Sequence, residues 1–243
     1  MKYIISNWKA YITAYAEAQR LVQCVQKKKM KKNIRWILCP PTFFLDRLSS
    51  VHSKKFFWGA QDVSSVSSGP YTGETSTNML KASSVSYVIL GHSERRLYNN
   101  ETDTIINAKI KSALKAGLKI ILCVGERIRE DQQGIPESVG VQLRAALSGV
   151  TPHAITRHII VAYEPIWAIG TGVTDTPQDT LCAALYLRKT IGDLYGHVIG
   201  KKLKVVYGGS VNASNIHLFI NQLGIDGVLI GHASTQIKEL EMM

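Results

Sequence analysis

Eight short apolar runs, each followed by a polar stretch long enough for a helix, constrain the fold of this 243-residue chain most strongly. The runs are continuous rather than alternating, which is typical of parallel strands buried on both faces. Parallel strands need long crossover connections, usually helices. The runs are Tyr3–Ser6, Ile34–Cys39, Phe56–Ala60, Tyr87–Leu90, Leu118–Val124, His158–Tyr163, Leu203–Tyr207 and Gly227–Ile230.

Amphipathic helical patterns fall between these runs. They include Tyr15–Lys29, Asp103–Ala116, Val139–Leu147, Gln178–Tyr195 and Asn215–Gln222. Thr102 and Thr176 stand where N-caps are expected, and Pro177 suits a first helical turn. Eight strand–helix units in a chain of this length favour a closed barrel over an open sheet. We therefore expect an α/β protein with a single-domain (β/α)8 barrel of eight parallel strands over residues 1–243.

Composition excludes several classes of protein. Hydrophobic residues make up 45% of the chain and charged residues 19%, which argues against disorder. No apolar run approaches the roughly 18 to 20 residues needed to cross a membrane. The first run is also too short for a signal peptide, so we expect a cytoplasmic protein. Cys24, Cys39, Cys123 and Cys182 contain no Cys-x-x-Cys pair, so neither a disulfide framework nor a zinc site is predicted.

The chain is basic, with 29 Lys and Arg against 18 Asp and Glu, a net charge of +11. The densest run, residues 27–32, stands where the first helix should end, and cations there interact favourably with the helix dipole. No aromatic residues are interleaved with it, so a nucleic-acid site is not expected. A positive field would suit a small phosphorylated ligand.

The segment from Ala162 to Gly172 carries the strongest sign of chemistry. Its apolar run ends in Glu164, followed by Pro-Ile-Trp and then by Ala-Ile-Gly-Thr-Gly. This order places a candidate general base at a strand tip, beside a loop able to close over it and keep water out. A solvated loop carboxylate is the alternative reading of Glu164 alone.

Other reactive side chains also follow apolar runs. In (β/α)8 barrels, active sites are built at the C-terminal ends of the strands. The residues at or just past these ends are Asn7, Lys9, His92, Glu164, Ser210 and Gly231. Their shared position predicts that they meet in one site.

The ordered set of motifs resembles the triosephosphate isomerase family over essentially the whole chain. The motifs are Asn7-Trp8-Lys9, Gly91-His92-Ser93-Glu94-Arg95-Arg96, Tyr163-Glu164-Pro165-Ile166-Trp167-Ala168-Ile169-Gly170-Thr171-Gly172 and Gly208-Gly209-Ser210. The resemblance implies a TIM barrel that interconverts dihydroxyacetone phosphate and D-glyceraldehyde 3-phosphate through an enediolate, in glycolysis and gluconeogenesis. It implies no metal and no organic cofactor.

The resemblance also implies a role for each residue. Glu164 matches the family's base, His92 its electrophile and Lys9 its electrostatic stabiliser. Asn7 would add an uncharged donor beside Lys9. Glu94 would tune Lys9 and His92, or would only form a structural ion pair.

Phosphate binding is implied at Gly170, Ser210, Gly231 and His232. The family commonly has a second glycine where His232 stands. Because only proline lacks a backbone N–H group, the donor survives this change, and we expect the imidazole to point outward.

Residues 69–74, Gly-Pro-Tyr-Thr-Gly-Glu, resemble the family loop that reaches into a second subunit. The resemblance therefore implies a homodimer, in which Thr72 supports Asn7 and Lys9 of the other copy. Ala10 departs from the larger side chain common after the family's lysine. A plain surface loop is the alternative.

Two other functions share this fold. One is a different phosphate-binding barrel enzyme, which would not need Lys9, His92 and Glu164 together. The other is a non-catalytic phosphate- or RNA-binding protein on the same barrel, because a fold alone does not fix function.

Overall fold

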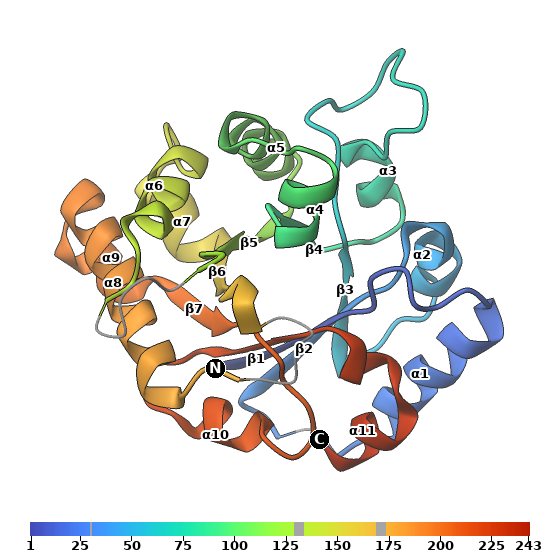
Figure 1. The fold of residues 1–243 in the computed structure, drawn as a ribbon. Coiled ribbons are helices and arrows are strands. Elements are labelled where there is room, and N and C mark those ends of the chain that lie inside the picture. The colour runs from blue at the N-terminus through green and yellow to red at the C-terminus, as the bar shows by residue number, and fades with distance from the viewer. Residues whose placement is uncertain (30, 129–133, 169–173) are drawn as a thin grey trace.

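The computed structural model describes residues 1–29, 31–128, 134–168 and 174–243. Within them, eight parallel strands pair in chain order, and β8 closes onto β1. Figure 1 shows the strands at the centre and the helices around them. The strands are β1 Lys2–Asn7, β2 Ile34–Cys39, β3 Phe56–Ala60, β4 Tyr87–Leu90, β5 Lys119–Val124, β6 Ile159–Tyr163, β7 Lys204–Tyr207 and β8 Gly227–Ile230. The predicted closed TIM barrel is confirmed.

Helices connect the strands on the outside of the barrel (Figure 1). They are α1 Tyr15–Lys27, α2 Thr42–Ser49, α3 Thr77–Ala82, α4 Ser93–Tyr98, α5 Asp103–Lys115, α6 Glu137–Ala146, α7 Pro152–His158, α8 Pro177–Tyr195, α9 His197–Lys202, α10 Ile216–Asn221 and α11 Ile237–Met242, with 3-10 turns η1 Ile166–Ala168 and η2 His232–Thr235. The predicted boundaries shift by one or two residues. His158, predicted to open a strand, instead ends α7, because this helix leads directly into β6.

The core has two parts on opposite faces of the strands. Ile5, Ile37, Ile89, Ile121 and Val206 belong to a cluster inside the barrel. Their neighbours along each strand, Ile4 and Trp36 for example, belong to the larger cluster shared with the helices. Side chains alternate between the two faces of a strand, so both faces must be apolar. This explains why the apolar runs in the sequence are continuous.

Side-chain caps fix where two of the longer helices begin. The Thr102 hydroxyl accepts the Ile105 N–H at the start of α5, and the Thr176 hydroxyl accepts the Asp179 N–H at the start of α8. Each cap satisfies a backbone donor that has no partner within its helix. Both predicted caps are confirmed.

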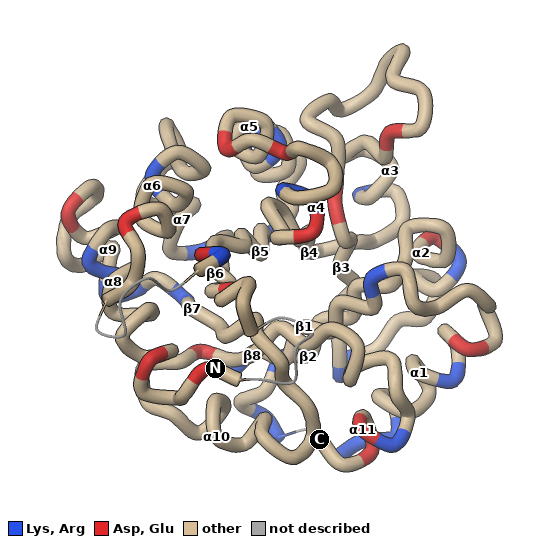
Figure 2. Tube along the Cα trace, viewed as in Figure 1, with Lys and Arg blue, Asp and Glu red and all other residues tan. Residues whose placement is uncertain are grey.

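Charged residues of both signs are spread over the helices around the barrel (Figure 2). Helix α1 ends at Lys27, so the first lysine of the basic run lies in its last turn, as predicted. None of the helices in the described ranges has the length and apolar character that a membrane span requires.

A buried ion cluster ties α4 and α5 to the segment after β3. The Lys109 ammonium lies 2.7 Å from Asp62 and 2.5 Å from Glu101, and Arg95 on α4 pairs with the same two carboxylates. Burial alone would raise the pKa of Glu101, but hydrogen bonds and charges from Lys109 and Arg95 lower it. Burial raises the pKa of Asp62 despite Lys109. The cluster therefore holds α4 at the strand ends. Each of its two carboxylates is paired with both Lys109 and Arg95.

Replacing Lys109 by Met should lower the free energy of unfolding by about 3–5 kcal/mol, because it leaves the carboxylates of Asp62 and Glu101 with only the partly exposed Arg95 as a cation. Urea unfolding measures the loss. Lys111→Met is the matched control, since Lys111 is exposed on the same helix. Equal stabilities for the two variants would contradict a structural role for the cluster.

Candidate active site

A cavity of about 540 Å³ opens at the C-terminal ends of the strands. The predicted site residues that line it are Asn7, Lys9, His92, Glu164, Ser210, Gly231 and His232. Glu94 contacts two of them from α4. Gly170 lies outside the described residues. The barrel thus gathers side chains that are up to 225 residues apart in sequence, from Asn7 to His232.

Lys9 is held in an uncommon backbone conformation just after β1. Its φ is 48°, in the left-handed region that residues with a Cβ rarely occupy. Its N–H donates to Asn7 Oδ1 at 3.1 Å, and Asn7 is itself buried at the end of β1. Such a conformation costs roughly 1–3 kcal/mol and persists only where its surroundings enforce it.

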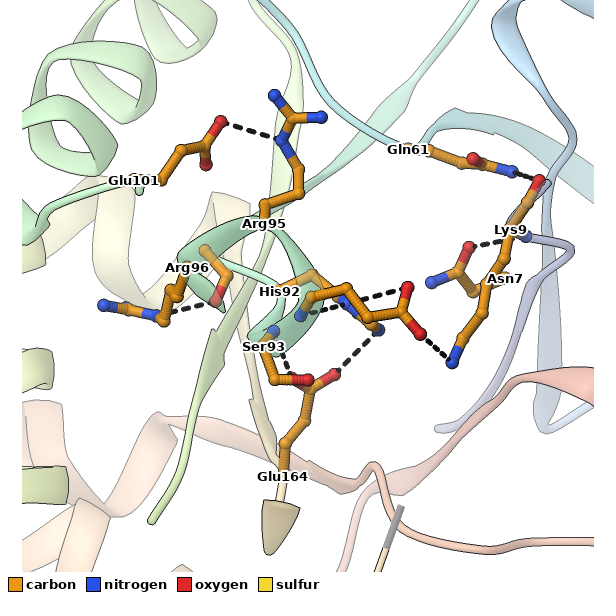
Figure 3. A network of polar contacts seen from close by, with 11 residues as sticks. Asn7, Lys9, Gln61, His92, Ser93, Arg95, Arg96, Glu101 and Glu164 are labelled. Atoms are coloured by element: carbon orange, nitrogen blue, oxygen red, sulfur yellow. Dashed lines mark hydrogen bonds and ion pairs between the residues drawn. The ribbon is translucent and has the colours of Figure 1, made fainter. Parts of the chain in front are cut away.

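Gln61 supplies part of that enforcement. It follows β3 directly, and its side-chain amide donates to the carbonyl of Lys9 at 2.8 Å (Figure 3) and to that of Cys39 at 3.0 Å. Gln61 therefore joins the ends of β2 and β3 to the strained turn. Sequence reasoning missed this residue, although its position directly after a strand was a signal that could have found it.

His92 is the N-cap of α4. Its Nδ1 accepts the Glu94 N–H at 3.2 Å, which requires that Nδ1 carry no proton. The ring proton is thus assigned to Nε2, which faces the cavity side and lies 3.3 Å from Glu164 Oε1 (Figure 3). The structure gives His92 a donor where a carbonyl oxygen could be bound.

Glu164 directly follows β6 and is only 2% exposed. Its Oε2 accepts the Ser93 N–H of α4 at 3.0 Å (Figure 3). Its Oε1 accepts no hydrogen bond from the residues that the structure describes. Oε1 is therefore the oxygen of this carboxylate that no backbone group anchors.

Glycines make room for this carboxylate. A Cβ at Gly125 would lie 1.7 Å from the Glu164 carbonyl oxygen, and one at Gly208 would lie 2.9 Å from Glu164 Cγ. Any larger residue at Gly125 would push the backbone of Glu164 away from β5. Both glycines therefore set the position of the Glu164 side chain.

Cys123 also lies beside Glu164, inside the barrel. Burial, together with the Glu164 carboxylate, raises the pKa of its thiol well above the ordinary value. The thiol is therefore protonated near neutral pH and is no nucleophile. Cys39 is likewise buried and free.

The Glu94 carboxylate lies between Lys9 and His92 and contacts both. The Lys9 ammonium lies 2.5 Å from Glu94 Oε1, and His92 Nδ1 lies 3.6 Å from Oε2. Glu94 is partly exposed and Lys9 is mostly buried. The predicted contact of Glu94 with Lys9 is therefore present. The partner of Arg96 in the structure is Asp103, at 2.6 Å.

The opposite wall of the cavity is made of backbone and small side chains. The Ser210 hydroxyl donates to the Ala168 carbonyl at 2.6 Å, which connects the β7 end to η1. Gly231 caps η2, and His232 is its first residue. The first N–H groups of a helical turn have no partner within it and can bind an anion.

His232 is exposed, and its ring lies against Tyr11. The two ring centres are 4.7 Å apart, and both side chains line the cavity. The imidazole therefore packs against the Tyr11 ring at the rim of the cavity. Tyr11 was not among the predicted site residues, because nothing in the sequence pairs it with a residue 221 positions away.

Taken together, the site presents a buried carboxylate and an imidazole donor on one side and an ammonium group beside them. This set can remove a proton from carbon, donate to an oxygen and stabilise negative charge.

Comparison with known proteins agrees with this arrangement. The family model for triosephosphate isomerase matches residues 2–243. A triosephosphate isomerase of Alkaliphilus oremlandii is 40% identical over 97% of this chain and 95% of that protein. One of Dehalococcoides mccartyi is 42% identical over 97% of this chain and 92% of its own, and one of Treponema pallidum is 39% identical over 96% and 94%. The chain therefore belongs to the triosephosphate isomerase family.

Proposed function

We propose that this chain catalyses the reversible isomerisation of dihydroxyacetone phosphate and D-glyceraldehyde 3-phosphate through an enediolate. The observation that carries the proposal is the pair formed by the buried carboxylate oxygen Oε1 of Glu164 and Nε2 of His92, which lie 3.3 Å apart. A base and a proton donor that face each other can act on neighbouring atoms of one small substrate. A purely phosphate-binding or RNA-binding protein would have no use for this pair.

Glu164 would act as the base. The reaction moves a proton between two adjacent carbons, so the base must reach both without changing its anchor. The carboxylate offers two oxygens, of which only Oε2 is bound in the free site. Substrate would enter between Oε1 and the His92 ring, where it would replace the 3.3 Å contact.

His92 would act as the electrophile through Nε2–H. A neutral imidazole that donates to the carbonyl oxygen stabilises the negative charge that develops there in the transition state. The Glu94 N–H fixes the proton on Nε2 by occupying Nδ1.

Lys9 would stabilise the same oxyanion and attract the phosphate. Its ammonium is held by Glu94, so its place is fixed before substrate arrives. Asn7 would contribute by fixing the backbone of Lys9 through its side-chain oxygen. Preorganised charge of this kind needs no rearrangement at the moment of reaction.

The phosphate would lie on the opposite wall, at Ser210, Gly231 and His232, with Gly170 as the further expected donor. The start of η2 offers backbone N–H groups, which bind phosphate without a permanent charge. Lys9 then supplies the attraction at a distance. A triose is short enough to span both walls of one cavity of about 540 Å³.

A homodimer is the assembly that best suits the loop of residues 69–74. This loop projects away from the barrel between β3 and α3 (Figure 1). All six residues are exposed, including the aromatic ring of Tyr71. Phe43, which follows β2 at the same end of the barrel, is 90% exposed. Exposed aromatic groups of this kind mark protein–protein interfaces.

A cytoplasmic location agrees with the free cysteines and with the proposed reaction. Cys24, Cys39, Cys123 and Cys182 are free, and Cys182 is exposed. Exposed thiols persist where the surroundings are reducing. The substrates are also intermediates of glycolysis and gluconeogenesis, as the family implies.

Replacing Glu164 by Gln should lower kcat for isomerisation of glyceraldehyde 3-phosphate by at least ~10²- to 10⁴-fold, because it removes the base and keeps the shape. A coupled assay measures the rate. Glu241→Gln, at an exposed position of α11, is the control and should retain full activity. Near-normal turnover in E164Q would refute the assigned base, and a folded but inactive natural chain would favour a binding role.

Replacing His232 by Gly should leave kcat and KM close to those of the natural chain, because the backbone N–H remains and the ring rests on Tyr11. Steady-state kinetics with both triose phosphates measures this. A KM lowered several-fold in H232G would instead show that the imidazole hinders phosphate binding.

Sedimentation at micromolar concentration should give about twice the chain mass of 26.9 kDa. A chain in which residues 69–74 are replaced by a short glycine linker should sediment as a monomer and lose activity, because Thr72 is expected to support Asn7 and Lys9 of the other copy. A monomeric natural chain with full activity would rule out the dimer as the working form.

A further inference from the structure

The opposite mouth of the barrel, at the N-terminal ends of the strands, carries several basic side chains that the proposed reaction does not use. The described residues lining a small cavity there include Arg35 on β2, Lys119 on β5, His158 before β6 and Lys204 on β7. Arg157 lies at its exposed edge.

The strand alternation explains why these groups converge. Arg35, Lys119 and Lys204 each stand on a strand two residues before a member of the cluster inside the barrel, namely Ile37, Ile121 and Val206, and His158 at the end of α7 lines the same cavity. Residues two apart on a strand point to the same face. The cations therefore form the last layer of the barrel interior. Strand register places Arg35 beside Tyr3 and Lys119 beside Tyr87.

Tyr87 holds two of the cations in place. Its hydroxyl accepts from Arg35 Nη1 at 3.2 Å, and the Lys119 ammonium lies 5.4 Å from its ring centre. The Arg35 guanidinium also lies over the Phe57 ring at 5.0 Å. These contacts are to neutral groups, so they orient the cations and leave their charge uncompensated.

Carboxylates are scarce at this mouth. Asp226 pairs with Lys204 at 2.9 Å and with Arg188 at 2.8 Å, so its charge is already shared. Neither Arg35, Lys119 nor Arg157 forms an ion pair with any residue in the described ranges. Burial and Arg35 lower the pKa of Lys119. Burial, then Lys119, His153 and Arg157, lower the pKa of His158. Like charges therefore face one another across a confined space.

We infer that this mouth binds a small tetrahedral oxyanion, of the class of inorganic phosphate and phosphate monoesters, at a second site distinct from the active site. The cavity of about 80 Å³ is small and opens to solvent at Arg157, which suits a compact anion. Arg35 and Lys119 would donate charge-assisted hydrogen bonds, and the phenols of Tyr3 and Tyr87 lie in the same lining. Bound anion would relieve repulsion between the strand ends and so stabilise the barrel.

His158 provides a local reporter for the test. The ring proton of His158 is followed by NMR while inorganic phosphate, or methyl phosphate as a monoester probe, is added at constant ionic strength set with chloride. An anion beside the imidazole favours its charged form, so the pKa of His158 should rise towards its ordinary value as the site fills. The His92 ring reports phosphate in the active site in the same spectra. His158→Gln assigns the signal.

The variant R35Q/K119Q should weaken the phosphate response of His158 at least about tenfold, because it removes the two charged donors. The response of His92 should stay. Lys81→Gln, an exposed lysine on α3, is the matched control for loss of charge and should behave as the natural chain. Lys119→Gln alone gives the same test with less change to the fold.

A saturable shift of His158 with either probe supports the site, and the stronger probe identifies the source of the oxyanion. A His158 signal that shifts with neither probe would overturn the proposal. So would a response in R35Q/K119Q or in K119Q as strong as that of the natural chain, because the field of the whole protein would then account for it.

Discussion

The N-terminus of α4 is the constraint on which the site depends. Its first backbone N–H groups have no partner within the helix, and two of them bind site residues instead. The Ser93 N–H holds one oxygen of Glu164, and the Glu94 N–H holds Nδ1 of His92. One turn of helix thereby sets both the position of the carboxylate and the tautomer of the imidazole. The ion cluster of Lys109, Arg95 and their two carboxylates keeps that turn in place.

Lys9 shows how a rigid barrel supports an unfavourable local conformation. Its left-handed backbone is held from two sides, by Asn7 on its own strand and by Gln61 after β3. Glu94 then binds its ammonium. The pairing of β1, β2 and β3, whose buried side chains are mostly apolar, offsets the cost of the conformation. The site gains a cation whose place is fixed before any ligand binds, which is the basis of electrostatic preorganisation.

The sequence predicted the barrel and the strand-end residues because both depend on local patterns. Continuous apolar runs report parallel strands, and residues just past them must lie at one rim. Short helices such as α3 and α9 have six residues each, too few to show a clear period, and so were not among the helices predicted. Tyr11 and the Ser93 N–H were missed for another reason. Their importance comes from contacts between distant segments, which no local pattern records. The cationic layer at the opposite mouth likewise becomes visible only when the strands are aligned in register.

The tautomer of His92 is the most direct test of this account, because it links the helix terminus, the hydrogen bonds and the proposed chemistry. ¹⁵N NMR of the labelled imidazole in the free enzyme measures which nitrogen carries the proton. We expect a protonated Nε2 and an unprotonated Nδ1 at neutral pH, in line with the Glu94 N–H contact of 3.2 Å. A proton on Nδ1 would contradict it, since the ring could then neither accept from α4 nor donate to a substrate oxygen in the cavity.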